Sequence, residues 1–418
     1  MKKSRPTIGI VKSRVFLTGT AFVLMACSSG EEFAGHSGKG EEPVITPVLC
    51  TSGASEQAVK VYDFLRENRN KKTLSGTMAC PSWNVNEAEW VYQHTGKYPA
   101  IAFFDYLSLE YSPCSWIDYS KTKIVEDWWN KNGLVGAGWH WRVPCVQGSA
   151  ERHYTPGDGS VDPGTGKRTT TVFSAANATK EGTWENEVVK ADLKKLAGYL
   201  KLLRDKRIPV IWRPLHEAAG NIYNYKNGKA WFWWGNDGAE AYKKLWIYIF
   251  NYFKKEGINN LIWVWTTQTK DSEFYPGDEY VDMVGRDMYP AKDEYTTGEY
   301  CFRQYGTITA SCPGKLVALS ECGNGEQSGK VYHLARISAQ WEAGAKWTYF
   351  MPWYDYSRTK ELDSEAFTAT SHRYADKDWW VDVQSPNQKI PDRKTKCVIK
   401  THINIKQNVI FSAKLKPV

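Results

Sequence analysis

The chain has 418 residues, of which 42% are apolar and 14% aromatic, including 20 tryptophans and 24 tyrosines. This length accommodates one barrel-type domain or two ordinary domains, and the apolar fraction supplies a large core. The formal charge of +8 belongs to the two ends of the sequence, and the slightly acidic part between them argues against a nucleic-acid-binding protein.

The first predicted element is a targeting segment, residues 1–26, which is not part of the fold. Basic residues precede an apolar run, Val15 to Ala26, that is too short to span a bilayer as a mature helix. The run ends in Leu-Met-Ala-Cys at 24–27, which resembles a bacterial lipobox and implies cleavage before Cys27 and lipidation of its thiol. The acidic residues that follow resemble export signals of surface lipoproteins in Bacteroidota. We therefore expect an outer-membrane lipoprotein, at the cell surface or in the periplasm, that touches the membrane only through its lipid anchor. The alternative is a secreted protein in which this cysteine is incidental.

Residues 27–50 are rich in Gly, Glu and Pro and predict a flexible tether. After residue 50, short apolar runs alternate with amphipathic stretches. The predicted strands are 72–77, 99–106, 133–141, 208–215, 260–266, 281–288, 316–320 and 345–351. The clearest predicted helices are 54–69, 120–131, 186–205, 238–256 and 329–343. Near-continuous apolar strands separated by helices indicate a parallel sheet covered by helices. Eight such units favour an α/β fold, a (β/α)8 TIM barrel in residues 51–385, and no Gly-x-Gly-x-x-Gly follows the first strand to support dinucleotide binding.

Three features are left open by the sequence. The polar insertion 143–185 follows the third strand, on the side where barrel active sites form, and either walls a cleft or decorates the surface. The basic tail 386–418 has no assigned role, and is either a disordered extension or a short strand pair. The cysteines contain no CxxC pair and so do not indicate a zinc site, whereas Cys301 and Cys312 either close a disulfide or stay free.

Two glutamates end two of the predicted strands. Glu217 follows the fourth strand in Ile-Trp-Arg-Pro-Leu-His-Glu, and Glu321 follows the seventh in Leu-Val-Ala-Leu-Ser-Glu. The carboxyl ends of barrel strands meet on one face, so these side chains are expected to face each other across the mouth. A pair of carboxylates suits cleavage of a glycosidic bond, and a separation of about 5–5.5 Å gives retention of configuration. The alternative is that each glutamate is an ordinary surface or ion-paired carboxylate.

At these motifs the chain resembles glycoside hydrolase family 26, a family of barrels with catalytic glutamates on strands four and seven whose best-known activity is endo-β-1,4-mannanase. The matching motifs cover roughly residues 55–385: Trp-His-Trp at 139–141, Trp-Arg-Pro-Leu-His-Glu at 212–217, Trp-Phe-Trp-Trp-Gly at 231–235, Tyr-Pro-Gly-Asp-Glu-Tyr-Val-Asp at 275–282, Leu-Ser-Glu at 319–321 and Pro-Trp-Tyr at 352–354. The chain departs from the family in residues 218–230, a longer spacer that can displace Trp231 and reshape the leaving-group side of the cleft.

The resemblance implies a role for each matching residue. Glu217 would be the general acid/base, with His216 setting its pKa and position, and Glu321 would be the nucleophile that forms a glycosyl-enzyme intermediate. The remaining residues would hydrogen-bond the nucleophile, hold a carboxylate, line the cleft or stack on sugars: Tyr289, Arg213, His140, Trp231 and Trp353. Simple chemistry agrees, because an acid/base needs a pKa raised by apolar walls and a second carboxylate, and an ionised nucleophile needs donors around it.

These observations predict a retaining endo-β-1,4-mannanase that acts on mannan, glucomannan or galactomannan without a metal or cofactor. The same mechanism on β-1,3-xylan or mixed-linkage glucan, or exo-acting release of mannobiose, stays open because loops determine the substrate. A different class is a non-catalytic glycan-binding lipoprotein, which would keep the tryptophans but need not keep both carboxylates. A zinc protease is disfavoured, since Gly220 interrupts the pattern His-Glu-x-x-His.

Overall fold

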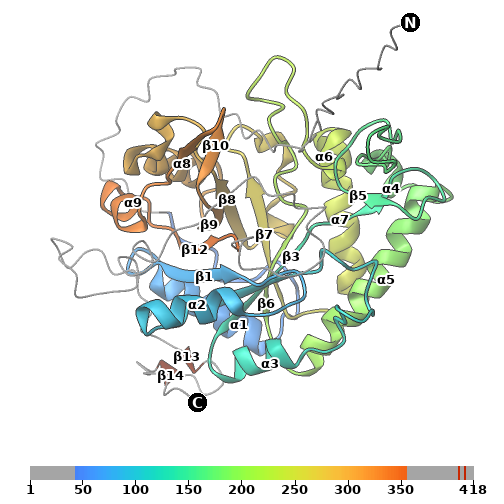
Figure 1. Ribbon diagram of the computed structural model, residues 1–418. Coiled ribbons are helices and arrows are strands. Elements are labelled where there is room, and N and C mark those ends of the chain that lie inside the picture. The colour runs from blue at the N-terminus through green and yellow to red at the C-terminus, as the bar shows by residue number, and fades with distance from the viewer. Residues whose placement is uncertain (1–42, 355–402, 405–408, 411–418) are drawn as a thin grey trace, which may run out of the picture.

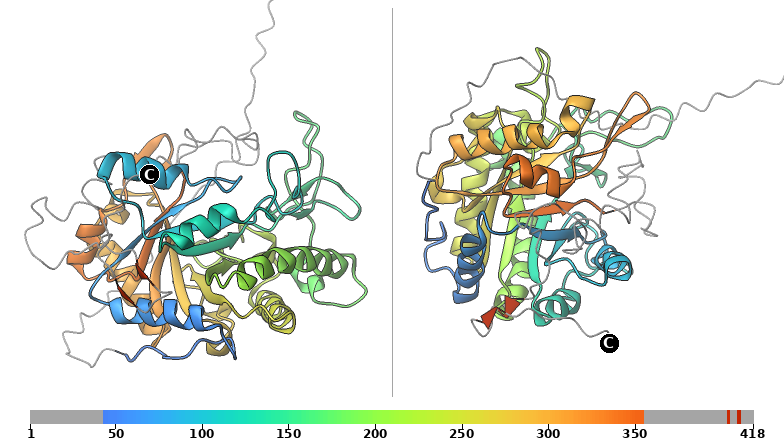
Figure 2. Two further views of the ribbon diagram at one scale, coloured as in Figure 1. Left: turned by 90° about the horizontal axis from the view of Figure 1, so that it is seen from below. Right: turned by 90° about the vertical axis from the view of Figure 1, so that its left-hand side faces the viewer.

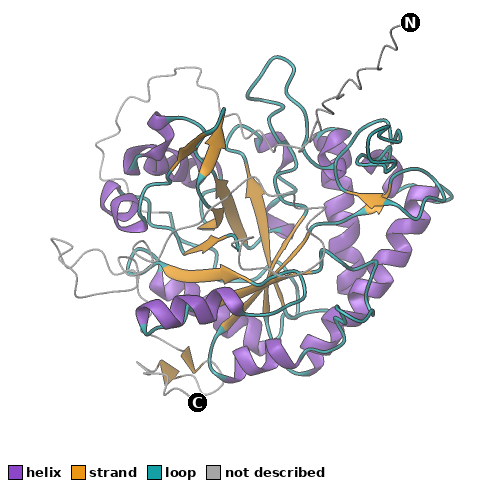
Figure 3. Cartoon of the chain, in the orientation of Figure 1, coloured by secondary structure: helices purple, strands orange, loops and turns teal. Residues whose placement is uncertain are grey.

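A closed barrel of eight parallel strands forms the centre of the protein. The computed structural model describes residues 43–354, 403–404 and 409–410. The barrel strands, orange in Figure 3, are β1 (Leu74–Met78), β2 (Ile101–Asp105), β3 (Leu134–Trp139), β6 (Val210–Pro214), β7 (Leu261–Thr267), β8 (Met283–Met288), β9 (Leu316–Cys322) and β12 (Tyr349–Pro352). They neighbour each other in the order β1-β12-β9-β8-β7-β6-β3-β2, and each overlaps one predicted apolar run. The predicted (β/α)8 barrel is therefore confirmed.

Helices surround this barrel (Figure 1). The longer ones are α1 (Glu56–Asn68), α2 (Asn86–Thr95), α3 (Lys123–Asn130), α5 (Trp184–Asp205), α7 (Ala239–Lys255), α8 (Gly298–Ser311) and α9 (Ile337–Ala343). Single turns are α4 (Ala175–Ala178), α6 (Trp233–Asn236), η1 (Ser272–Phe274), η2 (Asp278–Tyr280) and η3 (Asp293–Thr296). In the described part of the chain, none of the helices combines the length and apolarity needed to cross a membrane.

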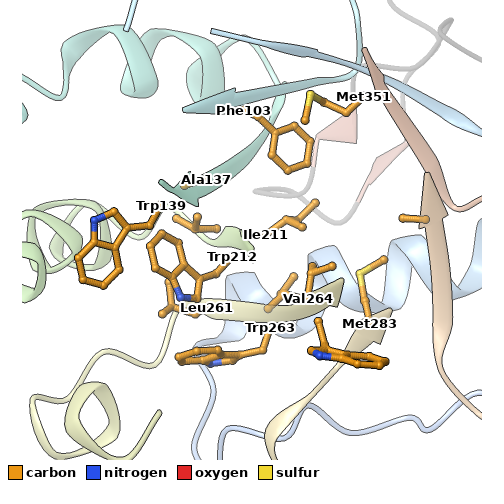
Figure 4. Packing of buried hydrophobic residues seen from close by; sticks show 14 of the residues in the cluster. Phe103, Ala137, Trp139, Ile211, Trp212, Leu261, Trp263, Val264, Met283 and Met351 are labelled. Carbon is orange, nitrogen blue, oxygen red and sulfur yellow. The ribbon is translucent and has the colours of Figure 1, made fainter. Parts of the chain in front are cut away.

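The barrel strands are buried on both faces, because one face fills the interior and the other packs against helices. One apolar cluster contains Phe103 on β2, Ile211 on β6 and Val264 on β7 (Figure 4). The packing requires glycine at position 136 on β3, because a Cβ there would lie 2.3 Å from the ring of Phe103. The ring of Phe103 in turn lies 5.4 Å from that of Tyr349 on β12. This contiguous core makes the barrel a rigid support for its upper loops.

Helix α5 shows how the outer layer is specified. The hydroxyl of Thr183 caps its start by accepting a hydrogen bond from the backbone N–H of Asn186 at 3.2 Å. Its buried side chains recur every three or four residues, as in Val189, Leu193 and Leu196, and form one stripe. Figure 2 shows this helix on the outside of the barrel.

The beginning of the described chain corrects one predicted boundary. Residues 43–50 were assigned to the flexible tether, but Ile45 and Leu49 are buried in the apolar cluster. The backbone N–H of Thr46 donates to the carbonyl of Gly314 at 2.9 Å, which fixes this segment against the barrel. The domain therefore begins before residue 50. The predicted signal segment 1–26 and the rest of the tether up to residue 42 lie outside the described residues.

One further prediction was wrong, and the structure bears on two questions that the sequence left open. The predicted helix 329–343 starts later, because its first part forms β11 (Lys330–Tyr332), which pairs with β10 (Gly325–Gln327) in a hairpin. Cys301 and Cys312 are free and lie at opposite ends of α8, about 16 Å apart along the axis, too far for a disulfide. In the tail, β13 (Ile403–Asn404) and β14 (Val409–Ile410) pair antiparallel, and the other residues after 354 lie outside the described part.

Candidate active site

Both predicted carboxylates lie at the carboxyl end of the barrel. Glu321 is on β9, the seventh barrel strand in sequence, and Glu217 follows Pro214, the last residue of β6, the fourth. Their side chains are buried, with residue exposures of 8% and 7%. Both residues therefore lie at the same end of the barrel, although 104 residues separate them in the sequence. Burial, followed by the negative charges of Asp287 and Glu321, raises the pKa of Glu217.

An irregularity in the sheet aligns Glu321 with a third carboxylate. Along the β8–β9 ladder Arg286 is opposite Leu319, but the next residue, Asp287, is opposite Glu321, so Ser320 is an extra residue on β9. Such bulges redirect side chains and are common beside active sites. Here the bulge pairs Glu321 with Asp287, and the hydroxyl of Ser320 donates to Asp287 at 2.7 Å.

The turn after β6 holds Glu217 in an unusual backbone conformation. Leu215 and Glu217 have φ angles of 48° and 51°, in the left-handed region that non-glycine residues rarely adopt. Each such residue costs about 1–3 kcal/mol, and such strain gathers at functional sites. Neighbouring side chains hold the turn, since the hydroxyl of Tyr242 donates to the carbonyl of Leu215 at 3.1 Å and the indole of Trp234 donates to that of His216 at 2.9 Å.

Glu321 is surrounded by hydrogen-bond donors and positive charge. The hydroxyl of Tyr289 donates to its Oε1 at 2.6 Å, and the Arg213 guanidinium lies 3.1 Å from its Oε2. The same guanidinium forms an ion pair with Asp287. Burial, followed by the charge of Asp287, raises the pKa of Glu321 to about 7, whereas Arg213, His140 and the Tyr289 hydrogen bond oppose the rise.

Glu217 has a different electrostatic environment. Burial raises its pKa well above the usual range, and the negative charges of Asp287 and Glu321 raise it further. The charge of Arg213 opposes this rise. Since Arg213 forms its ion pairs with Asp287 and Glu321, the arrangement favours a protonated Glu217 beside an ionised Glu321.

Two histidines complete this end of the barrel. Asp105, the last residue of β2, accepts a hydrogen bond from the backbone N–H of His140 at 3.0 Å and also contacts its Nδ1. The His140 ring lies 4.3 Å from that of His216 and 5.2 Å from that of Trp353. Burial lowers the pKa of His216 well below its usual value, so its imidazole is neutral. The structure thus brings His140, His216 and Trp353 together.

Sequence reasoning missed Asp105 and Asp287. The sequence did contain a signal for both, since each is an acidic residue at the carboxyl end of a buried, mainly apolar strand. In a barrel this position faces the site.

The insertion 143–185 supplies part of the wall, which answers the question left open by the sequence. It contains the hairpin of β4 (Val143–Pro144) and β5 (Arg152–His153). The buried Tyr154 that follows lies 5.5 Å, ring to ring, from Phe232 and 6.2 Å from His140. Phe232, also missed from the sequence, stacks on Trp234 at 4.4 Å and lies 4.8 Å from His216.

The long spacer 218–230 is a compact loop. Its base closes where Asn221 accepts the backbone N–H of Lys229 on its side chain at 2.6 Å and donates its own N–H to the Lys229 carbonyl at 3.1 Å. The hydroxyl of Tyr223 ties the loop to Glu273 at 2.6 Å. Trp231, which directly follows the loop, is half-buried and lines a pocket together with Tyr289. The spacer therefore does not carry Trp231 away from Tyr289.

Within the described residues, no group of three or more His, Cys, Asp or Glu side chains is arranged to hold a metal ion.

Solved structures with this fold include enzymes of known name. The family 26 domain of an endo-β-mannanase/endo-β-glucanase from Prevotella bryantii is 35% identical, with a TM-score of 0.68 over 82% of this chain and 97% of that one. A β-mannanase from a symbiotic protist of the termite Reticulitermes speratus, solved with a gluco-manno-oligosaccharide, is 31% identical, with a TM-score of 0.65 over 83% and 97%.

Sequence relatives point the same way. Mannan endo-1,4-β-mannosidase B of Piromyces sp is 32% identical over 369 residues, 84% of this chain and 55% of that protein. A mannan endo-1,4-β-mannosidase of Thermothelomyces thermophilus is 32% identical over 287 residues, 68% of this chain and 54% of that protein. The chain thus spans about half the length of these relatives. The model of glycosyl hydrolase family 26 matches residues 50–378, and this chain belongs to that family.

Proposed function

We propose that this protein is a retaining endo-β-1,4-mannanase that hydrolyses mannan, glucomannan or galactomannan. The observation that carries the proposal is the unequal pair of buried carboxylates. Glu321 is held by Arg213 and Tyr289, while Glu217 lies where its protonated form is favoured. Such a pair is what double displacement requires. The named mannanases at 31–35% identity support mannan as the substrate.

In the first step, an ionised oxygen of Glu321 attacks the anomeric carbon and the glycosidic C–O bond breaks. Glu217 gives its proton to the departing oxygen, which leaves as a hydroxyl of the released chain. The sugar is then esterified to Glu321, whose negative charge is lost. Because that charge raises the pKa of Glu217, the pKa of Glu217 falls in the intermediate, and Glu217 becomes a base.

In the second step, Glu217 takes a proton from water as the water oxygen attacks the anomeric carbon. The ester bond to Glu321 breaks, and both carboxyl groups return to their starting protonation states. Two inversions at one carbon give net retention. Tyr289 and Arg213 stabilise the departing carboxylate of Glu321. We assign His140, His216, Trp231 and Trp353 to the substrate cleft.

The test is hydrolysis of a panel of β-glycans by the purified protein. We expect reducing sugar from mannan, glucomannan and galactomannan, and internal cleavage products from mannohexaose. NMR of the first product should show the β-anomer. Cleavage of β-1,3-xylan or mixed-linkage glucan without mannan would overturn the substrate, and mannobiose as the only early product would overturn endo action. Binding without any cleavage would indicate a glycan-binding protein.

The pH dependence should be bell-shaped. Activity needs Glu321 ionised, so kcat/KM should fall as pH decreases through the pKa of Glu321, about 7. Activity also needs Glu217 protonated, so kcat/KM should fall at high pH, through the raised pKa of Glu217. The charge of Asp287 raises both pKa values. Replacing Asp287 with Asn should therefore move both limbs of the profile to lower pH, and limbs that stay or move upward would contradict this assignment.

We also propose that the protein is a lipoprotein attached through Cys27, a residue outside the described part of the chain. The basic and apolar pattern of residues 1–26 and the motif at 24–27 support this. The full-length protein expressed in a Gram-negative host should incorporate a labelled fatty acid and sediment with membranes. Cys27→Ser should lose the label and become extractable without detergent. Equal labelling of both proteins would refute the anchor.

A further inference from the structure

The turn after β6 carries Glu217 on backbone that lies outside the strands and helices. Leu215 and Glu217 have φ angles of 48° and 51°, and neither residue belongs to a regular element. The turn closes on itself where the backbone N–H of Gly220 donates to the carbonyl of Glu217 at 3.0 Å. Left-handed φ angles are unfavourable for leucine and glutamate, so contacts from outside the turn must maintain them.

Two buried side chains bind successive backbone carbonyls of this turn. The hydroxyl of Tyr242, in the first turn of α7, donates to the carbonyl of Leu215 at 3.1 Å. The indole of Trp234, on α6, donates to the carbonyl of His216 at 2.9 Å. These carbonyls belong to the two peptide bonds that directly precede Glu217. The two hydrogen bonds therefore fix the orientation of both peptide planes that lead to the proposed acid/base.

Gly235 contacts the chain on the other side of Glu217. A Cβ at this position would lie 1.7 Å from the carbonyl oxygen of Ala218, the residue that follows Glu217. Glycine is the residue that allows such a close approach between two backbones. Helix α6 therefore contacts the turn before Glu217 through Trp234 and after Glu217 through Gly235. The end of the motif at 231–235 thus supports the acid/base from behind.

We propose that Tyr242 is a positioning residue for the proposed acid/base, and that it forms a clamp with Trp234 and Gly235 on the turn that carries Glu217. Tyr242 and Trp234 are 0% exposed, so neither side chain reaches the substrate. The clamp directs the carboxyl of Glu217 toward the glycosidic oxygen. Proton transfer requires heavy atoms within about 2.6–3.2 Å, so a small rotation of the turn weakens it. The inference rests on the proposed mannanase function and deepens it at the acid/base.

The test is Tyr242→Phe, which removes the hydroxyl and leaves the buried ring in place. kcat/KM is measured for mannohexaose and for a series of aryl β-mannobiosides whose leaving phenols differ in acidity. A sugar is a poor leaving group that needs the proton of Glu217, whereas dinitrophenol leaves without it. We expect kcat/KM to fall about tenfold for mannohexaose, the scale of one hydrogen bond, and by less than about twofold for the dinitrophenyl substrate.

Tyr62→Phe is a matched control. The hydroxyl of Tyr62 on α1 donates to the carbonyl of Thr46 at 3.0 Å, and its ring is also buried. Thr46 contacts Gly314, which precedes β9, so this hydrogen bond lies at the end of the barrel opposite to Glu217. The control should lower Tm as Tyr242→Phe does and retain the wild-type kcat/KM on every substrate.

Trp234→Phe is a second, independent variant of the clamp, and it replaces Tyr242→Phe if that protein fails to fold. It removes the hydrogen bond to the carbonyl of His216 and keeps an aromatic ring against Phe232. The loss of kcat/KM should again increase as the leaving group becomes poorer.

A loss that increases toward poor leaving groups, absent from Tyr62→Phe, supports the clamp. Equal losses on all substrates would mean a merely structural role, and unchanged kcat/KM on all of them would mean that the turn holds Glu217 unaided; either result overturns the inference. If the wild-type protein cleaves neither mannohexaose nor the aryl mannobiosides, the proposed function itself has failed. An active wild type with variants that lack the dependence on the leaving group refutes the clamp alone.

Discussion

Replacing Glu321 with alanine is expected to lower kcat on mannan by about 10⁴-fold or more, because the proposed nucleophile is lost. The protein should remain folded, since Arg213 keeps its ion pair with Asp287. Binding of mannohexaose, measured by calorimetry, should persist. The measurement that identifies the role is the product formed from an activated aryl β-mannoside with added azide. Azide enters from the side vacated by Glu321 and should give the α-mannosyl azide by a single inversion.

Glu294 offers a matched control for this experiment. It is an exposed glutamate on η3, at the same end of the barrel. Glu294→Ala should retain wild-type activity and give no azide product. A β-mannosyl azide from Glu321→Ala, or activity close to that of the wild type, would show that another group is the nucleophile.

The second large effect is expected at Glu217. Replacing it with alanine should lower kcat/KM on mannan by about 10²–10⁴-fold, the usual contribution of a general acid. On an aryl mannoside with a good leaving group, formation of the intermediate needs no acid and should be nearly preserved. Azide should then attack the glycosyl-enzyme and give the β-mannosyl azide by two inversions. Equal losses for good and poor leaving groups would reject the acid role of Glu217.

Glu217→Gln tests the physical origin of this role. A carboxyl whose pKa is raised by folding binds its proton more tightly in the folded state, so stability is greatest below its unfolded pKa and decreases as pH rises toward the folded pKa. Glutamine removes this dependence. At pH 7 the inactive variant should therefore have a higher Tm than the wild type. Its free energy of unfolding should be larger by up to about 1.4 kcal/mol for each pH unit above the unfolded pKa. The difference should vanish near pH 4, and a lower Tm at both pH values would contradict the burial argument.

The barrel was predictable because its strands are apolar on both faces and therefore stand out as continuous runs. Glu217 and Glu321 were predictable for the same reason, since each follows such a run. Helix α8 was not predicted because few of its side chains are buried, with Cys301 and Ile308 the only larger ones, and no apolar stripe marks it. Residues 43–50 resembled a tether in composition, but two apolar residues among them suffice to anchor the segment.

The partners of the carboxylates were harder to predict than the carboxylates themselves. The bulge that brings Asp287 opposite Glu321 depends on the pairing of β8 with β9 and leaves no local mark in the sequence. Sequence patterns locate groups along single elements, whereas the pKa of a carboxyl depends on charges that several elements bring together.

The closed base of the spacer 218–230 separates two tasks. Two hydrogen bonds between Asn221 and Lys229 hold the ends of the loop together, so the residues between them form a unit that is closed at its base. Exchanging that part should change which polysaccharides are accepted, while Glu217 after β6 and Glu321 on β9 keep their positions. This chain is thus a convenient scaffold for engineering glycan selectivity through loop grafts.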